Sequence, residues 1–444
     1  MLTANQILHE AFQRVLFVAD PQKSMPILLA EIFPNGIRGN CLVVGAGKAS
    51  ASMADAFEQY AQQNWPQAKI YGHVVTRYGH DVFTPIPNRK ISISEASHPF
   101  PDEAGLKASI AIMQLVGNLQ ENDFCIALIS GGGSSLLPLT ANHIPMDALQ
   151  KLTQELLRCG APIEEINVIR KHVSAIQGGR LAQLATRRGA QMIALIISDV
   201  VGDQASDIAS GPCAPDPSTY DDAIHILEKY QLHTHLGLTS IYQHLLQGQQ
   251  GLHRETLKVE DEICEQINNI VFATAQKGLE AAAEFCRTLG YEVHVLGDGV
   301  SGESQEVAKN HAALIRECLT NSNAKKIAWI SGGETTVTIP LGVVGRGGRC
   351  SEYLLALMQE TLDIKGMSAL AADTDGIDGS ENNAGAYFDA GVRNRYLAKG
   401  LNIEHYLQNH QAYDFFEQLD ALVMTGPTLT NVNDFRIILI DRYE

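Results

Sequence analysis

The chain carries one local pattern twice: an apolar stretch that runs into Ser-Gly-Gly and then into residues with hydroxyl groups. The first copy is IALISGGGSSLL at residues 126–137, and the second is IAWISGGETTVT at residues 327–338. Each apolar stretch predicts a buried strand, and glycines at the carboxyl end of a strand let backbone N–H groups approach an anion. One copy alone is equally typical of a tight turn without a ligand. Two copies, roughly 200 residues apart, favour an anion site assembled from two halves.

The length of the chain predicts two domains, because 444 residues exceed what one hydrophobic core usually organises. We expect an α/β fold with a Rossmann-like three-layer α/β/α domain at 1–250, a second α/β domain at 251–444, and the active site in the cleft between them. The boundary is placed near the polar stretch 247–251, and a strand at 267–274 is expected to open the second domain. Apolar residues at helical spacing predict an opening helix at 4–20 that packs on a sheet.

The charge balance and the cysteine pattern narrow the class of protein. A formal net charge of −17 disfavours nucleic acid or an anionic membrane as the main partner. No apolar run reaches the ~20 residues of a membrane span, and the N-terminus does not have the pattern of a signal peptide. Eight cysteines without a close CxxC pair indicate reduced thiols and no zinc site. We therefore expect a cytoplasmic protein that acts on small molecules, with a homodimer left open.

The segment GAGKAS at 45–50 predicts a glycine-rich turn between a strand and a helix. It departs from a dinucleotide fingerprint, because Ser50 replaces the third glycine and the next strand, 71–76, ends without an acidic residue. It is not a Walker A loop either, since Leu42 stands at the required upstream glycine. Lys48 lies at the mouth of the turn, where its ammonium could meet a phosphate. The alternative is a solvated lysine in the first turn of a helix.

Two further segments offer groups that could bind an anion. His98 lies among the turn-forming residues of 93–105, which form either a rigid connector or the edge of a cleft. The segment 166–182 is the most basic in the chain, and its cationic residues cannot all share one helical face. Some of them are therefore expected on the surface, and one or two at an anion. These residues are Arg170, Lys171, His172 and Arg180.

Aspartates follow two of the predicted strands. Asp199, Asp203 and Asp207 come after the strand at 189–197, where carboxylates suit magnesium binding or a general base, although helix caps and turns use aspartates as well. Asp373, Asp375 and Asp378 resemble a calcium loop, but Ala384 replaces the glutamate at its twelfth position, which leaves a magnesium or structural role open. Between these groups, the segment 343–358 places Arg349 on a glycine loop, which suits bidentate recognition of phosphate or carboxylate.

Taken together, these motifs resemble the type-2 glycerate kinase family, whose C-terminal half contains the leucine-rich MOFRL domain. The resemblance covers nearly the whole chain and rests on eight motifs that occur in order. They are GAGKAS (45–50), HPFPDEAG (98–105), SGGGSSLL (130–137), RKHVSAIQGGRLA (170–182), SDVVGDQASDIASGP (198–212), VGRGGR (344–349), DTDGIDG (373–379) and TGPTLTNVND (425–434).

The resemblance implies a glycerate 2-kinase, which transfers the γ-phosphoryl group of ATP to the 2-hydroxyl of D-glycerate, with Mg²⁺ as cofactor. It places the MOFRL region at about 325–440. It also implies catalytic roles for Lys48, Asp199 and Arg349, which match positions of the family motifs. The chain departs from the family at Cys350-Ser351, where Asn-Gln is common, and this leaves the choice of acceptor less defined than the reaction class.

The remaining candidate residues fall into three groups. Phosphate or nucleotide binding is expected at Gly45, Gly47, Ser130, Gly131, Gly132, Gly133, Ser134, Ser135, Ser331, Gly332, Gly333 and Glu334. Substrate binding is expected at His98, Arg170 and Lys171, and metal binding at Asp203 and Asp375. Two other functions stay open: an NAD(P)H-dependent hydroxypyruvate reductase, which the imperfect fingerprint disfavours, and a non-catalytic nucleotide or sugar-acid binding protein, which the carboxylates beside the glycine loops disfavour.

Overall fold

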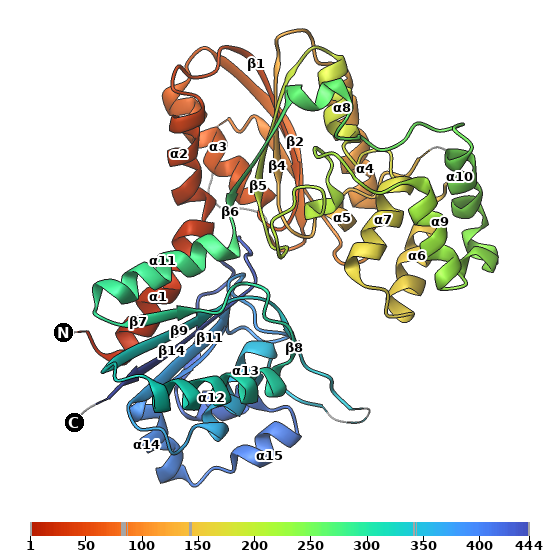
Figure 1. Ribbon diagram of the computed structural model, residues 1–444. Coiled ribbons are helices and arrows are strands. Elements are labelled where there is room, and N and C mark those ends of the chain that lie inside the picture. Colours follow the sequence, from red (N-terminus) through yellow and green to blue (C-terminus); the bar gives the residue numbers. More distant parts are fainter. Residues whose placement is uncertain are drawn as a thin grey trace. The chain divides into compact units, whose positions relative to one another are not determined.

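The computed structural model describes residues 2–80, 86, 88–141, 144–340, 342 and 344–442. The chain forms two compact units (Figure 1). The N-terminal unit is Pro21–Phe272, and the C-terminal unit joins Met1–Asp20 to Ala273–Glu444. Val343, the first residue of the predicted loop and helix at 343–358, lies outside the described residues.

The N-terminal unit is built on a sheet with the strand order β3-β2-β1-β4-β5-β6. This is the order of a doubly wound dinucleotide-type fold, and it makes β1 and β4 neighbours at the point where the order reverses. The pairings from β3 to β5 are parallel, and β1 and β4 end together, with Ala46 opposite Ile129. The strands are β1 Gly39–Ala46, β2 Ala68–Arg77, β3 Ile91–Ala96, β4 Phe124–Ile129, β5 Gln191–Ile197 and β6 Ile267–Ala273.

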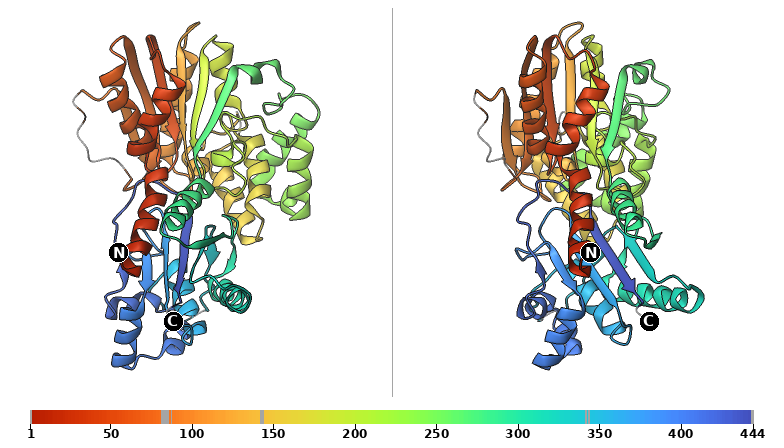
Figure 2. Two further views of the ribbon diagram at one scale, coloured as in Figure 1. Left: turned by 60° about the vertical axis from the view of Figure 1, so that its left-hand side comes forward. Right: turned by 90° about the vertical axis from the view of Figure 1, so that its left-hand side faces the viewer.

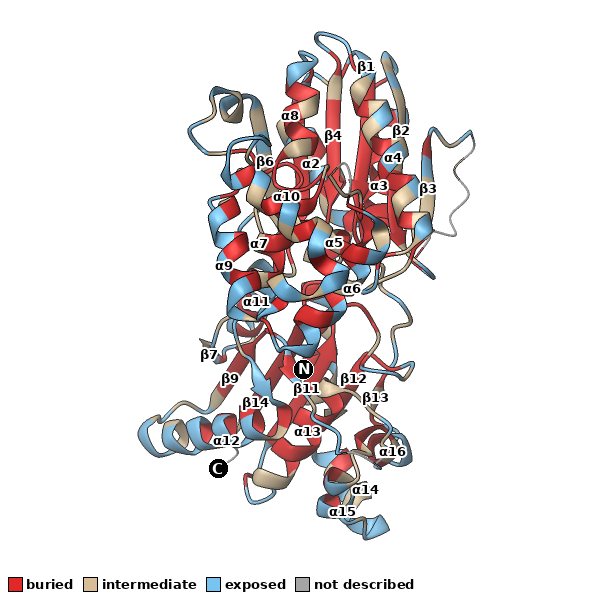
Figure 3. Cartoon of the chain, turned by 90° about the vertical axis from the view of Figure 1, so that its right-hand side faces the viewer, coloured by how far each residue is buried: buried red, intermediate tan, exposed pale blue. Residues whose placement is uncertain are grey.

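Helices cover both faces of this sheet and give the three layers that the sequence predicts. α3 packs on one face beside α2, and α4 and α8 pack on the other. The central strands are buried on both faces (Figure 3), which explains why their sequences are continuous apolar runs. The helices are α2 Pro21–Ile32, α3 Ser50–Asn64, α4 Glu103–Gly117, α5 Gly133–Leu136, α6 Met146–Arg158, α7 Ile163–Val173, α8 Arg180–Arg187, α9 Tyr220–Lys229 and α10 Thr239–Gln249, with 3₁₀ turns η1 Ile208–Ser210, η2 Leu232–Thr234, η3 Leu236–Leu238 and η4 Glu262–Gln266.

Four of these helices form a helical lobe beside the sheet of the N-terminal unit. α6, α7, α9 and α10 share an apolar core of their own, to which Leu152, Ile169, Leu227 and Leu245 contribute. α7 also contacts η1, and η1 contacts α5, the short helix that follows β4. The lobe therefore carries α7 to the carboxyl end of the central strands.

The C-terminal unit contains a mixed sheet with the strand order β13-β12-β11-β14-β9-β7. β7 pairs with β9 in parallel, and the other neighbours are antiparallel. The unit comprises α1 Ala4–Ala19, α11 Ala275–Thr288, β7 Glu292–Val295, β8 Gly302–Glu303, α12 Ser304–Asn321, β9 Lys326–Ser331, β10 Thr335–Thr336, α13 Arg349–Glu360, β11 Met367–Asp373, β12 Gly385–Phe388, α14 Ala390–Lys399, α15 Ile403–Gln408, α16 Ala412–Gln418, β13 Leu422–Val423 and β14 Asp434–Asp441.

The leucine-rich helix α13 lies at the centre of the core of the C-terminal unit. All of its residues from Cys350 to Met358 are buried, between the sheet and the helices α12, α15 and α16. α1 and α11 pack on the sheet as well, through β11 and β14 for α1 and through β7 and β9 for α11. A helix that is buried on all its faces is expected only in such a central position.

Two segments join different partners from those expected. The helix predicted at 4–20 forms as α1, but it belongs to the C-terminal unit, where Phe12 stacks on Phe435 with 5.9 Å between ring centroids. α1 also lies along α11 (Figure 2), where Gly278 leaves room for Val15. The strand predicted at 267–274 forms as β6, but it is the sixth strand of the N-terminal sheet and does not open the second unit. The boundaries of the two units therefore differ from the division expected at residue 250. Local sequence patterns indicate whether a segment forms a helix or a strand, but not which sheet it packs on or joins.

Across the described chain, no helix combines the length and the apolar character that a membrane span needs. The eight cysteines are unpaired thiols, of which five are buried.

Candidate functional site

The glycine loops after β1 and β4 contact each other at the switch point of the N-terminal sheet. The Lys48 amide donates to the Gly131 carbonyl at 2.9 Å, and the Ala49 amide donates to the Ser130 hydroxyl at 3.0 Å. In open parallel sheets, ligands bind at this point, beyond the carboxyl ends of the strands. The structure thus brings together the predicted phosphate loops of 45–50 and 130–135.

Three of the predicted site residues surround the second of these loops. A Cβ at Gly131 would lie 1.7 Å from Asp199 Oδ2, so a side chain at this position would displace the Asp199 carboxylate, which follows β5. Gly132 has a φ of +79°, and a Cβ there would lie 3.1 Å from the His98 ring and 3.3 Å from the Lys48 side chain. Asp199, His98 and Lys48 therefore converge on one short loop from three different strand ends.

A cavity of about 240 Å³ opens beside this loop within the N-terminal unit. Its lining combines the predicted residues with side chains from α6, α7 and η1. The lining residues are His98, Pro99, Gly132, Ser134, Ser135, Thr153, Leu157, Ile163, Ile166, Asn167, Arg170, Asp199, Val200, Asp207 and Ala209.

The orientation of α7 determines which side chain of the basic segment lines the cavity. One face of α7 lines the cavity, and its residues are spaced three or four positions apart, as the helical repeat requires. They are Ile163, Ile166, Asn167 and Arg170. Lys171 is rotated by one residue from this face, and its ammonium is buried against the Asp216 carboxylate at 2.8 Å. Lys171 is therefore a structural ion pair and does not line the cavity, contrary to its predicted role in substrate binding.

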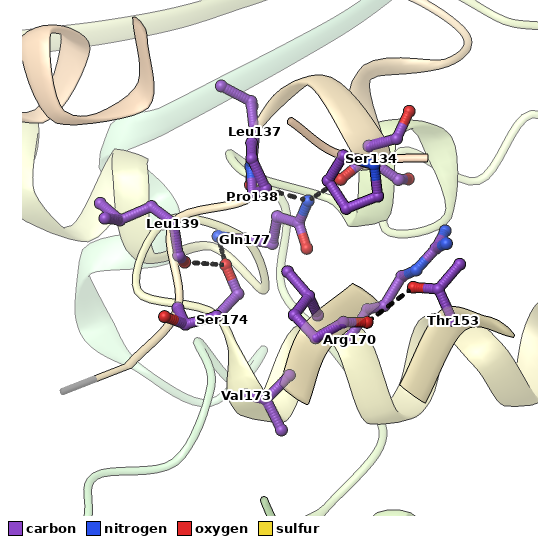
Figure 4. Close-up of a pocket in the computed structure, with 13 residues that line it drawn as sticks. Ser134, Leu137, Pro138, Leu139, Thr153, Arg170, Val173, Ser174 and Gln177 are labelled. Carbon is purple, nitrogen blue, oxygen red and sulfur yellow. Dashed lines mark hydrogen bonds between the residues drawn. The ribbon is translucent and has the colours of Figure 1, made fainter. Parts of the chain in front are cut away.

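Arg170 brings a positive charge to the wall of the cavity. Within the described chain its guanidinium makes no salt bridge, and Arg170 lines the same pocket as Thr153 and Ser134 (Figure 4). Burial lowers the pKa of Arg170 to about 10, which still leaves it charged at neutral pH. An unpaired, partly buried cation at a cavity wall fits an anionic ligand, because the ligand supplies the missing counter-charge.

His98 is neutral at physiological pH. Burial, together with the nearby positive charges of Lys48, Arg77 and Arg170, lowers the pKa of His98 to about 4. A neutral imidazole can donate one hydrogen bond and accept one, so it suits a polar group of a ligand better than a second anion-binding charge.

A hydrogen-bonded chain that the sequence analysis did not single out supports the glycine loop. The hydroxyl groups of Ser134 and Ser210 are hydrogen-bonded to each other at 2.9 Å, and the Ser210 hydroxyl donates to the Asn167 amide oxygen at 3.0 Å. The sequence holds a usable signal for Asn167, because it stands three residues before Arg170 on the same helix. Ser210 carries no comparable signal, since only the fold brings η1 to the loop.

The three aspartates after β5 separate in space. Asp199 and Asp207 line the cavity, whereas Asp203, a predicted metal ligand, does not. Asp203 takes a left-handed backbone conformation with a φ of +54° and donates its amide to the Val200 carbonyl, which is the geometry of a turn. Asp203 therefore forms a turn, which is one of the uses of aspartate expected from the sequence.

In the C-terminal unit, Arg349 opens α13 and contacts three carboxylates. Its guanidinium lies 2.5 Å from Asp373, 2.8 Å from Asp434 and 3.2 Å from Glu334. Burial alone would lower the pKa of Arg349, but the carboxylates of Asp434 and Asp373 raise it well above the ordinary value. Two of the pairs are buried, whereas the Glu334 side chain is 59% exposed, so this third contact is the one that a ligand can displace.

The acidic residues around Arg349 outnumber the basic ones. Burial, together with the neighbouring carboxylates of Asp375 and Asp434, raises the pKa of Asp373 well above its usual range. The predicted metal ligand Asp375 is buried beside Asp373, to which it donates its amide at 3.0 Å. Arg349 pairs with Asp373, Asp434 and Glu334, Arg436 pairs with Asp434, and Asp375 lies beside Asp373. The cluster thus holds four carboxyl groups and two guanidinium groups, and an added cation would balance it. Oxygen donors of this kind suit Mg²⁺.

The second Ser-Gly-Gly loop differs from the first in architecture. Its strand β9 continues through Gly332 and Gly333 into β10, whereas the first loop leads into a helix. Ser331 is buried in the ladder opposite Arg436, whose guanidinium also binds the Gly332 carbonyl at 3.0 Å. The two copies of the pattern therefore present different groups, and only the first offers a helix start at its glycines.

The positions at which the chain departs from the family are buried inside the C-terminal unit. The Asp378 carboxylate accepts from the amides of Cys350 and Ser351 and from the Ser351 hydroxyl at 2.6 Å. Burial raises the pKa of Asp378 to about 6, and the hydrogen bonds from Ser351 oppose the shift. Cys350 and Ser351 thus belong to the first turn of α13 and to its cap.

The chain matches known families and proteins over most of its length. Residues 7–245 match the family DUF4147, described as a domain of unknown function, and residues 327–434 match the MOFRL family. The chain is 35% identical to the D-glycerate 2-kinase of Thermotoga maritima, over 90% of each chain. It is 40% identical to a protein of Agrobacterium vitis that is provisionally named a hydroxypyruvate reductase, over 99% of this chain and 95% of that protein. A crystal structure of glycerate kinase from Thermotoga maritima superposes with a TM-score of 0.84 at 34% identity, covering 98% of each chain.

The fold and the matches together define a two-unit α/β kinase. The chain belongs to the type-2 glycerate kinase family, and it carries both a DUF4147 region and a MOFRL region.

Proposed function

We propose that the protein is a glycerate 2-kinase, which transfers the γ-phosphoryl group of ATP to the 2-hydroxyl of D-glycerate and releases ADP and 2-phosphoglycerate. One observation carries the proposal: the cavity of the N-terminal unit holds an unpaired cation, Arg170, and a carboxylate, Asp199, beside a phosphate-type glycine loop. A 2-hydroxy acid offers the complementary pair, because its carboxylate needs a cation and its adjacent hydroxyl needs a base. Relatives named as glycerate kinases support the same acceptor.

Different residues of the cavity bind different groups of the acceptor. Arg170 holds the carboxylate of glycerate with charge-assisted hydrogen bonds. Asp199 orients the 2-hydroxyl and accepts its proton as the bond to phosphorus forms. His98 in its neutral form, together with Asn167, offers hydrogen bonds to the remaining hydroxyl of glycerate.

The glycine loop and Lys48 act on the transferring phosphoryl group. The transition state of phosphoryl transfer spreads negative charge over the phosphoryl oxygens, so positioned cations and N–H groups stabilise it. Lys48 lies against Gly132 and supplies such a cation, and the turn into α5 adds backbone N–H groups.

In the C-terminal unit, Arg349 and the acidic cluster around it are the groups that suit the phosphates of a nucleotide. We propose that a phosphate oxygen of the nucleotide displaces the exposed Glu334 carboxylate from Arg349, while Asp373 and Asp434 keep the guanidinium in place. Mg²⁺ fits the excess of carboxylates in this cluster, and Asp375 with Asp373 would hold it. When bound, Mg²⁺ neutralises charge on the phosphates of ATP.

The reductase alternative has the name of the Agrobacterium vitis relatives in its favour. The loop after β1 argues against it. Ser50 stands where a dinucleotide fold needs its third glycine, and its hydroxyl is buried against the carbonyls of Gly47 and Val75 at 2.9 and 2.7 Å.

One assay with purified protein separates these functions. ADP release is measured with ATP, Mg²⁺ and D-glycerate, and NADH or NADPH oxidation is measured in parallel with hydroxypyruvate. We expect glycerate-dependent ADP release and no oxidation of either cofactor. Reduction of hydroxypyruvate without ADP release would replace the kinase proposal with the reductase, and neither activity would favour a binding protein.

A further inference from the structure

Glu292, His294 and Cys318 form a compact group of side chains in the C-terminal unit, which the kinase chemistry leaves unused. Their ligand atoms all lie within 4.8 Å of one another. The Glu292 carboxylate lies 3.0 Å from His294 Nε2, and the Cys318 sulfur lies 3.9 Å from the same nitrogen. This is a triangle of one oxygen, one nitrogen and one sulfur.

The fold holds this triangle together from two elements. Glu292 and His294 stand two residues apart on β7, so they share one face of that edge strand. Cys318 lies in the last turn of α12, where the negative end of the helix dipole favours a cation. The His294 ring stacks on Trp329 at 5.2 Å, with 21° between the planes, and this contact restricts its orientation.

We propose that Glu292, His294 and Cys318 bind Zn²⁺, with water as the fourth ligand. Thiolate, imidazole and carboxylate are the three protein ligands of zinc, whereas Mg²⁺ prefers oxygen alone. Zinc bonds of about 2.0–2.3 Å separate tetrahedral ligand atoms by roughly 3.3–3.8 Å. The observed triangle reaches that size with small side-chain adjustments.

The exposure of the group leaves room for the water ligand. The His294 and Glu292 side chains are 38% and 48% exposed, so the open side of the triangle faces solvent. The Cys318 thiol loses its proton when the S–Zn bond forms, and the proton passes to solvent. The sequence prediction of no zinc site considered close cysteine pairs, whereas this group uses a single cysteine with ligands from a distant strand.

The proposed ion would join the edge strand β7 to α12 and would be separate from the Mg²⁺ that serves ATP. Neither Glu292, His294 nor Cys318 belongs to the residues that we assign to catalysis. Zinc binding at these residues therefore does not depend on the proposed kinase activity.

Cobalt titration of the full-length, untagged and reduced protein tests the site. Co²⁺ reports a thiolate ligand by a charge-transfer band in the near ultraviolet, and excess Mg²⁺ saturates sites that contain oxygen ligands only. We expect one Co²⁺ per chain with a thiolate band, displaced by one equivalent of Zn²⁺. The band is expected to vanish in Cys318→Ser and to need at least about tenfold more Co²⁺ in His294→Ala. The control Cys159→Ser changes an exposed thiol elsewhere and should bind like the wild type.

Thermal unfolding gives a second readout on the same variants. Zn²⁺ is expected to raise the Tm of the wild type and of Cys159→Ser, but not that of Cys318→Ser. A wild-type protein without a thiolate band, or a band that persists in Cys318→Ser, would overturn the proposal. In that case the three side chains form an ordinary surface hydrogen-bonded group.

Discussion

Arg170 is the residue on which recognition of the acceptor depends in this account. Its guanidinium lines the cavity, and within the described chain no carboxylate pairs with it. Replacing it with methionine removes a charge-assisted contact worth about 1.5–3 kcal/mol, so we expect the KM for glycerate to rise roughly ten- to a hundredfold. The KM for ATP should change little, and Arg170→Lys should restore part of the affinity. Steady-state kinetics with both substrates varied measure this, and an unchanged KM for glycerate would remove Arg170 from the acceptor site.

Asp199 and Lys48 have different physical tasks, which their variants should separate. Asp199→Asn keeps the size of the side chain but loses the proton acceptor, so turnover should fall about 10²–10⁴-fold with both substrate affinities nearly unchanged. Lys48→Met removes a cation that faces phosphate before and during transfer, so it should weaken ATP binding and turnover together, by roughly ten- to a hundredfold. The measurement is turnover and both affinities across a magnesium titration. Near-normal turnover of Asp199→Asn would exclude Asp199 as the base, and partial rescue by excess Mg²⁺ would make it a metal ligand instead.

Because His98 is buried, we expect the protein to become less stable as the pH falls. The pKa of His98 falls from 6.5 to about 4 in the folded protein, so between these values the unfolded chain binds more protons. The free energy of unfolding therefore decreases as the pH falls from 6.5 towards 4. His98→Asn should show a smaller decrease over this range in urea unfolding experiments, whereas the exposed control His225→Asn should follow the wild type. Equal slopes for the wild type and His98→Asn would contradict the assignment.

Sequence reasoning at the residue scale named candidate residues that the structure places close together, but it could not separate neighbours. It placed Lys48, Asp199 and Arg170 among the functional residues, and the structure gathers all three at the first glycine loop or its cavity. It treated Lys171 like Arg170, because the two side chains have the same charge and are adjacent. The difference between them is a rotation of one residue on α7, which depends on the buried partner Asp216.

At the scale of the element, the first turn of α13 explains the departure from the family at positions 350 and 351. Ser351 is buried, and its hydroxyl binds the capping carboxylate of Asp378. Ser351→Ala removes a hydrogen bond to a buried carboxylate, so it should lower the free energy of unfolding by about 1.5–3 kcal/mol while the KM for ATP and that for glycerate stay unchanged. Urea unfolding and steady-state kinetics on one preparation measure both effects. A change of several-fold in either KM without a loss of stability would show that position 351 contacts a substrate.

Elements were predicted well in type and less well in partner. The strand at 267–274 and the helix at 4–20 both form, yet β6 joins the N-terminal sheet and α1 packs against the C-terminal one. Periodicity records which residues of a segment are buried and not what covers them. The stacking of Phe12 on Phe435 joins residues at opposite ends of the chain, and no local pattern carries that information.

At the scale of the whole molecule, the strand order of the N-terminal unit is the feature that makes a kinase site there physically reasonable. The order 3-2-1-4-5-6 creates one switch point, and the two glycine loops of 45–50 and 130–135 both lie at it. The sequence predicted the two loops, but their adjacency follows only from the order of the strands. The mixed sheet of the C-terminal unit was not predicted, because parallel and antiparallel neighbours leave similar apolar runs when both faces are buried.

The central claim is that the protein places phosphate on the 2-hydroxyl of D-glycerate, and identification of the product tests it most directly. The wild-type protein is incubated with ATP, Mg²⁺ and D-glycerate, and the mixture is then given enolase with and without phosphoglycerate mutase. The account predicts that enolase alone converts the product to phosphoenolpyruvate, because enolase accepts 2-phosphoglycerate. A product that enolase uses only after the mutase is added would be 3-phosphoglycerate, and it would contradict the proposed placement of the 2-hydroxyl beside Asp199.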